Sequence, residues 1–188
     1  SGEAVSRQFD SDELGTFDLG ARSTSADGQL SLAASLYYTD WQNIQSDQLL
    51  ANGLVSTRNV GHGKIIGGEA SADWRLRPTL LLSAGFSAQR ANLVATQAGI
   101  ELEDRRLPVA PNITARLSLA HDFDIGGARA SVKAQANYVG RARLTFDEGL
   151  DRQMGNFATV SSVATLATSG VLLSARIDNM FDIKGDSF

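Results

Sequence analysis

The sequence has no cysteine, two histidines and three prolines, and these shortages exclude several kinds of protein. Without cysteine there is neither a disulfide framework nor a thiolate metal site. Two histidines are too few for a histidine-rich metal centre. No run of about 18 apolar residues occurs, so a transmembrane helix is not expected. The chain carries 17 Lys and Arg against 21 Asp and Glu, without a basic cluster, and this argues against nucleic-acid binding.

What the sequence does contain is apolar and polar residues in alternation, with a period of two along nearly the whole chain. Leu30, Leu32 and Leu36 occupy even positions, for example, and serines fill several of the odd ones. This period predicts about eight antiparallel β-strands of roughly 10 to 13 residues or more. Soluble strands are typically about 5 to 6 residues, whereas a tilted strand needs about 9 to 11 to cross a bilayer.

The connections between the expected strands alternate between short and long. Tight turns are expected at 26–28, 77–78, 125–127 and 169–170, where Gly, Asp and Pro occur. Long polar links are expected at roughly 44–58, 90–111 and 142–155. Strict alternation places all short turns at one end of the sheet. The pattern therefore predicts an all-β, antiparallel transmembrane β-barrel with short periplasmic turns and long extracellular loops.

The positions of the aromatic residues support a membrane barrel, in which the apolar face meets lipid and the polar face lines the lumen. Tyr38, Tyr138 and Phe181 are expected near the outer end of the apolar face, and Trp74 and Phe123 near the inner end, as two aromatic girdles. Alternation alone does not separate this interpretation from a soluble β-sandwich or a lipocalin-like barrel, so these remain alternatives.

Several short segments carry a family likeness by their order and spacing. They are LYYTDWQNI (36–44), NVG (59–61), GGE (67–69), LPVAP (107–111), YVG (138–140) and DNMFD (178–182). Together they resemble the late barrel strands of TonB-dependent outer-membrane receptors. The resemblance implies that residues 1–188 are a partial barrel of about eight late strands, with the plug domain and the final strand absent. It places the chain in the outer membrane of a Gram-negative bacterium.

By the same resemblance, the expected function is a part in TonB-dependent active uptake of a scarce nutrient such as a siderophore or a sugar. TonB would bind through the missing plug region, and outer-membrane lipid and the nutrient are the other expected partners. One alternative is a small complete eight-stranded barrel with a structural or adhesive role, which requires pairing between strands near 14–23 and 171–181. The other is a soluble lipocalin-like carrier, which the charged inward face argues against.

No enzyme activity, cofactor or metal site is expected. His121 shares its face with Leu119 and Phe123, so it is interpreted as an interfacial residue and not as a catalytic one. Two acidic groups are interpreted as solvated loops; they are Glu101, Glu103 and Asp104, and Asp147, Glu148 and Asp151.

The resemblance implies that a substrate meets the extracellular loops and the upper lumen. Polar residues expected at the outer ends of the inward faces are the candidate ligand-binding residues; they are Asn43, Gln45, Gln89, Asn137 and Arg141. Their amide and guanidinium groups are suited to hydrogen bonds with an oxygen-rich ligand.

Overall fold

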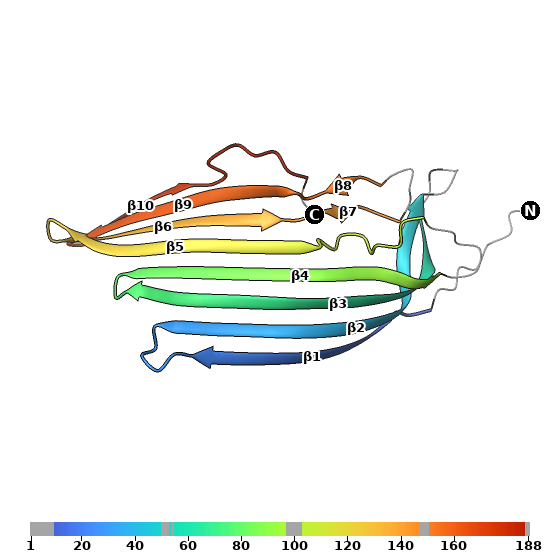
Figure 1. The fold of residues 1–188 in the computed structure, drawn as a ribbon. Coiled ribbons are helices and arrows are strands. Elements are labelled where there is room, and N and C mark those ends of the chain that lie inside the picture. Colours follow the sequence, from blue (N-terminus) through green and yellow to red (C-terminus); the bar gives the residue numbers. More distant parts are fainter. Residues whose placement is uncertain (1–9, 50–52, 54, 97–102, 147–150, 187–188) are drawn as a thin grey trace, which may run out of the picture.

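The computed structural model describes residues 10–49, 53, 55–96, 103–146 and 151–186, and the regular structure of these residues is β-strand (Figure 1). Eight strands form one antiparallel sheet in the order β1-β2-β3-β4-β5-β6-β9-β10. Within these residues, no helix has the length and apolarity needed to cross a membrane.

The strands of the main sheet are long. They are β1 (Glu13–Thr24), β2 (Leu30–Leu49), β3 (Val55–Arg77), β4 (Leu80–Thr96), β5 (Ile113–Ile125), β6 (Ala128–Val139), β9 (Phe157–Thr168) and β10 (Val171–Ile177). A separate two-stranded sheet joins β7 (Ala142–Arg143) to β8 (Gln153–Met154). Most main-sheet strands exceed the length that is typical of soluble proteins, as the sequence predicts.

All the tight turns lie together at one end of the sheet, and the longer links lie at the other (Figure 1). In the β5–β6 turn, Gly126 and Gly127 have φ values of 56° and 85°. Glycine adopts these positive angles without the steric cost that a Cβ atom brings. The predicted turns and their common location are therefore confirmed.

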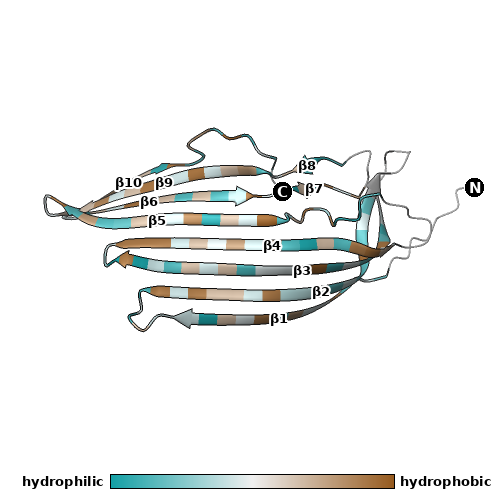
Figure 2. Ribbon diagram, viewed as in Figure 1, coloured by the Kyte–Doolittle hydropathy of each residue, from teal (hydrophilic) through white to brown (hydrophobic). Residues whose placement is uncertain are grey.

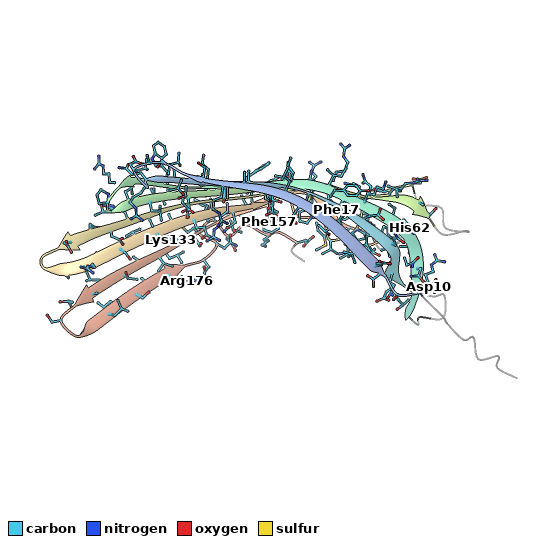
Figure 3. All side chains as sticks on the ribbon, turned by 90° about the horizontal axis from the view of Figure 1, so that it is seen from below. Asp10, Phe17, His62, Lys133, Phe157 and Arg176 are labelled. Atoms are coloured by element: carbon cyan, nitrogen blue, oxygen red, sulfur yellow. The ribbon has the colours of Figure 1, made fainter. Side chains whose placement is uncertain are left out.

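The sheet is strongly curved but does not close. In side view it forms an arch (Figure 3). Among the described residues, β1 pairs with β2 alone and β10 with β9 alone, so each keeps one open edge. The small complete barrel requires β1 to pair with β10, and the structure lacks that pairing. An antiparallel, all-β barrel fragment, the predicted fold class, is what the structure shows.

The two faces of the sheet differ in chemistry. On the convex face large apolar side chains are exposed; Phe17 is 77% exposed and Leu36 is 67% exposed. Apolar and polar residues alternate along much of the main sheet, as in β6 (Figure 2). No second sheet covers the convex face in the part of the chain that the structure describes. Because a soluble sandwich buries its apolar face, this arrangement fits a face that meets lipid.

Two of the predicted loop boundaries are wrong. Most of the expected link 44–58 is strand, with Gln45 opposite Asn59 and Asp47 opposite Thr57. Strand β4 likewise continues to Thr96, past the expected boundary at Arg90. Backbone hydrogen bonds hold these extensions, and such bonds do not require apolar and polar residues to alternate. Polar composition alone therefore did not mark the strand ends.

The buried apolar core is small and lies at the outer end of the sheet. Its members come from distant parts of the chain; they are Ile44, Val60, Ala91, Leu93, Leu107 and Phe146. Trp41, Ile65 and Ala110 pack against this outer cluster. The cluster holds the segment before β5 and the segment after β7 against the extended β2–β3–β4 strands.

Candidate functional site

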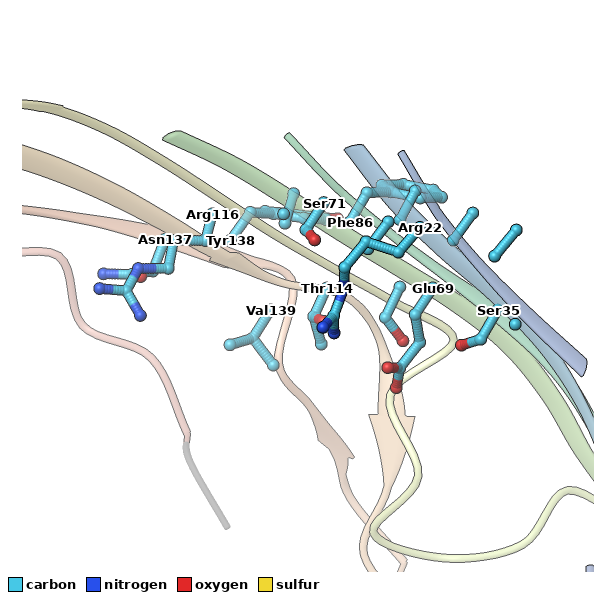
Figure 4. Close-up of a pocket in the computed structure, with 18 residues that line it drawn as sticks. Arg22, Ser35, Glu69, Ser71, Phe86, Thr114, Arg116, Asn137, Tyr138 and Val139 are labelled. Atoms are coloured by element: carbon cyan, nitrogen blue, oxygen red, sulfur yellow. The ribbon is translucent and has the colours of Figure 1, made fainter. Parts of the chain in front are cut away.

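A cavity of about 810 Å³ lies on the concave face and spans strands from β1 to β6. Its polar lining includes Arg22, Ser35, Glu69, Ser87, Thr114, Arg116 and Asn137. Figure 4 shows Arg22, Glu69 and Thr114 projecting from the same side of the sheet. The lining offers charges of both signs, hydroxyl groups and an amide. Such a surface is suited to binding a polar molecule or a polar protein segment.

Asn137, one of the predicted ligand residues, lines this cavity and ends a chain of hydrogen bonds. Arg116 Nη2 donates to Gln135 Oε1 over 2.6 Å, and Gln135 Nε2 donates to Asn137 Oδ1 over 3.0 Å. These hydrogen bonds hold the Asn137 side-chain amide in place through its Oδ1 atom. Its nitrogen has no partner among the described residues, so it is free to donate to a ligand.

Gln89 has its side-chain amide engaged within the protein. Tyr37 Oη donates to Gln89 Oε1 over 3.1 Å, and Gln89 Nε2 donates to the Pro111 carbonyl over 3.1 Å. A Cβ atom at Gly67 would overlap the Tyr37 ring, so that glycine makes room for the ring. Gln89 thus links β2, β4 and the segment before β5, and it holds these three parts of the protein in position.

Asn43 and Gln45 lie away from both Gln89 and Asn137. Asn43 has a φ of 51° at an irregularity in the β2–β3 pairing. Between these two residues, Ile44 packs into the outer cluster. Asn43 Nδ2 lies 3.4 Å from the Ser11 carbonyl, and Gln45 Nε2 donates to the Asp10 carbonyl over 3.1 Å. Both amides therefore anchor the chain just before β1.

Arg141 is exposed and lines a second cavity, of about 470 Å³, at the outer end of β4. Gln89, Arg90 and Asn112 line the same cavity. The structure therefore brings Gln89 and Arg141 together, places Asn137 on the larger cavity, and separates Asn43 and Gln45 from both.

Arg143 is a central residue of the outer end that the sequence analysis missed. It is 3% exposed, and its Nη1 donates to the Asp104 carbonyl over 2.6 Å. Its Nε lies 3.3 Å from Asp151 Oδ2, although no hydrogen bond satisfies that atom. The guanidinium also lies 5.9 Å from the Phe146 ring centroid. No local pattern distinguishes Arg143 from neighbouring arginines, because its partners come from two separate loops.

Asp104 and Asp151, which the sequence analysis interprets as solvated loop residues, lie in loops and are partly exposed, and both also face Arg143. Hydrogen bonds from the Arg106 side chain lower the pKa of Asp104 to about 2, against an opposing effect of burial. Asp104 in turn raises the pKa of Arg106. Glu101, Asp147 and Glu148 lie outside the described residues.

His121 lies where the sequence analysis placed it, on the convex face beside Phe123. The two rings stack with centroids 5.2 Å apart, and His121 Nδ1 lies 3.1 Å from the Thr79 carbonyl. In the described residues, no group of three or more His, Asp or Glu side chains is arranged to hold a metal ion.

The curved sheet with an apolar convex face and a polar concave cavity defines a fragment of an outer-membrane β-barrel. The sequence model of the family described as TonB dependent receptor-like, beta-barrel matches residues 15–180. The chain belongs to this family, and it is a protein of the Gram-negative outer membrane. No curated protein sequence matches it.

Solved structures share the fold. The ferric yersiniabactin uptake receptor FyuA from Yersinia pestis is 24% identical, with a TM-score of 0.77 over 94% of this chain and 26% of that one. The siderophore receptor PiuA from Acinetobacter baumannii is 20% identical, with a TM-score of 0.72 over 98% and 26%. The copper transporter OprC is 21% identical, with a TM-score of 0.71 over 92% and 26%. The chain thus spans about a quarter of the length of these proteins.

Proposed function

We propose that this chain is part of a receptor for TonB-dependent active uptake of a scarce nutrient, such as a siderophore or a sugar. The observation that carries the proposal is the polar cavity of about 810 Å³ on the concave face of a sheet whose convex face is apolar. Siderophore receptors among the structural relatives support a nutrient of that class.

The remaining strands and the plug of the proposed receptor would come from outside this chain. The open edges of β1 and β10 support that arrangement, because an unpaired strand edge in a membrane leaves backbone groups without hydrogen bonds. TonB would contact the plug region. Of the five candidate ligand residues, we infer that Asn137 and Arg141 contact the ligand, and their positions in the linings of the two cavities support this. Asn43, Gln45 and Gln89 would act by holding the surrounding backbone.

The test is nutrient uptake by the complete receptor carrying Asn137→Ala and Arg141→Ala. We expect uptake at limiting nutrient concentration to fall by about 10-fold or more, because each substitution removes a hydrogen bond to the ligand. The matched control is Gln29→Ala with Arg129→Ala, which removes an amide and a guanidinium group outside both cavities. Equal uptake by the two double variants would show that Asn137 and Arg141 do not bind the ligand.

A further inference from the structure

The polar groups of the larger cavity are arranged in rows of cross-strand partners. Ser35 of β2 lies opposite Glu69 of β3, and Glu69 lies opposite Ser87 of β4. Thr114 of β5 continues this row, and all four residues line the cavity. Directly opposed residues have Cβ atoms about 4.5–5.5 Å apart. A carboxylate therefore lies among three hydroxyl groups in the middle of the cavity.

Glu69 is the one acidic residue among those that line the cavity in the described part of the chain. In the next row, Arg22 of β1 and Arg116 of β5 lie two strands away from β3 on either side (Figure 4). Among the described residues, neither arginine nor Glu69 forms an ion pair. Arg116 donates to Gln135, and a guanidinium has further N–H donors. The cavity thus has an acceptor at its centre and cationic donors at its flanks.

This distribution discriminates between two classes of nutrient. A ferric catecholate complex is negatively charged, and its outer oxygens accept hydrogen bonds without donating any. The Glu69 carboxylate also only accepts, and it repels negative charge, so it opposes such a complex at the centre of the cavity. A sugar hydroxyl both donates and accepts. It can therefore donate to Glu69 and accept from the arginines.

An aromatic ring lies beside the same carboxylate. Tyr37 pairs with Gly67, and the far end of the Tyr37 ring occupies the space that a Cβ atom would take at that glycine. Gly67 and Glu69 are two residues apart on the same face of β3. The apolar face of a tyrosine ring can pack against the C–H groups of a sugar ring. The combination of hydroxyl groups, a carboxylate and an aromatic ring is therefore suited to a saccharide.

We propose that the larger cavity binds a neutral saccharide and that Glu69 selects it over a ferric siderophore. The inference rests on the proposed uptake function and narrows the nutrient to one of the two classes named there. The volume of about 810 Å³ lies within the range of about 300–1,000 Å³ that is typical of small-ligand sites. The siderophore receptors FyuA and PiuA, at 24% and 20% identity, share the fold and do not fix the ligand.

The test is binding by the complete receptor, purified in a polyoxyethylene detergent because a glucoside or maltoside would compete. The probes are an array of neutral di- to tetrasaccharides and a ferric tris-catecholate complex. We expect a saccharide to bind and the ferric complex to bind more weakly. Glu69→Gln should weaken saccharide binding by about 10-fold, because a charge-assisted hydrogen bond is lost. It should strengthen binding of the ferric complex by about 5-fold, because the repulsion between like charges is removed.

The matched control is Asp73→Asn, which removes a carboxylate from the same face of β3 outside the cavity and should change neither affinity. The inference is overturned if no saccharide in the array binds, or if Glu69→Gln moves both affinities in the same direction. Tight binding of the ferric complex alone would overturn it and leave the proposed uptake function standing. A saccharide that binds through Glu69 but is not taken up would support the inference and contradict the proposed uptake function.

Discussion

The turn-side half of the sheet and its outer end differ in the regularity of strand pairing and in the direction of their apolar side chains. In the turn-side half the β1–β2, β4–β5 and β5–β6 pairs keep an unbroken register, and the β3–β4 pair has one shift between Arg75 and Arg77. Apolar side chains project outward there, and the described residues of this half form no cluster of buried apolar side chains. At the outer end, register shifts interrupt β2–β3 and β3–β4, and apolar residues turn inward to form the outer cluster. The comparison indicates that lipid organises the first region, whereas packing between protein segments organises the second.

Substitution of Arg143 is expected to have the largest effect on the stability of the outer end. Replacement by Ala removes the buried partner of Asp104 and Asp151. Breaking a fully buried ion pair typically costs about 3–5 kcal/mol, and the lower end, about 3 kcal/mol, is expected because the two carboxylate side chains are 33% and 24% exposed. The matched control is Arg106→Ala, which removes an exposed partner of the same Asp104, and exposed pairs contribute about 0–1 kcal/mol.

The measurement is native-state hydrogen exchange of the Leu107 and Val109 amides, which donate to the Ala91 and Arg143 carbonyls. Both amides should exchange much faster in R143A and nearly normally in R106A. Similar rates in the two variants would mean that burial of Arg143 does not hold the outer end together.

A charge on the convex face tests the turn-side half. Ala84 lies on that face between Leu80 and Arg90, and Ala84→Arg should cost about 2–4 kcal/mol, as expected for Arg near the bilayer midplane. The neighbouring Ser83→Arg places the same group on the concave face beside Asp73, so it should cost little. Equilibrium unfolding of the complete receptor in vesicles separates the two. Equal destabilisation would contradict the assignment of the faces.

The turn-side half could be predicted from sequence because its determinants are local. Alternation over Leu30–Tyr38 or Ala128–Tyr138 fixes which residues share a face, and Gly126-Gly127 fixes where the chain reverses. The lipid-facing side chains of a strand need no specific contact partner, so the alternation within that strand is enough to predict which face each residue occupies.

The outer end could not be predicted in this way because its determinants are far apart in sequence. The alternation of apolar and polar residues in β2 shifts at the irregularity beside Asn43, and Ile44 packs into the outer cluster. The alternation therefore no longer predicts an inward direction for Asn43 and Gln45. The burial of Arg143 depends on Asp104, which lies 39 residues away. Of the five candidate residues, Asn137 lies in the regular part of β6, and it lines the larger cavity.

Lowering the pH is expected to have the smallest effect on stability, and this effect should be confined to the outer end. The folded-state pKa of Asp104 is about 2, below its ordinary value of 3.8. A carboxyl whose pKa is lowered on folding contributes stability above pH 3.8, and that contribution is lost as the pH falls toward 2. Exchange of the Leu107 amide should therefore accelerate over that interval, whereas amides in the middle of β5 should not respond. In Asp104→Asn the acceleration should disappear, because no charge remains to titrate. If the acid response persists in that variant, Asp104 does not control the acid response of the outer end.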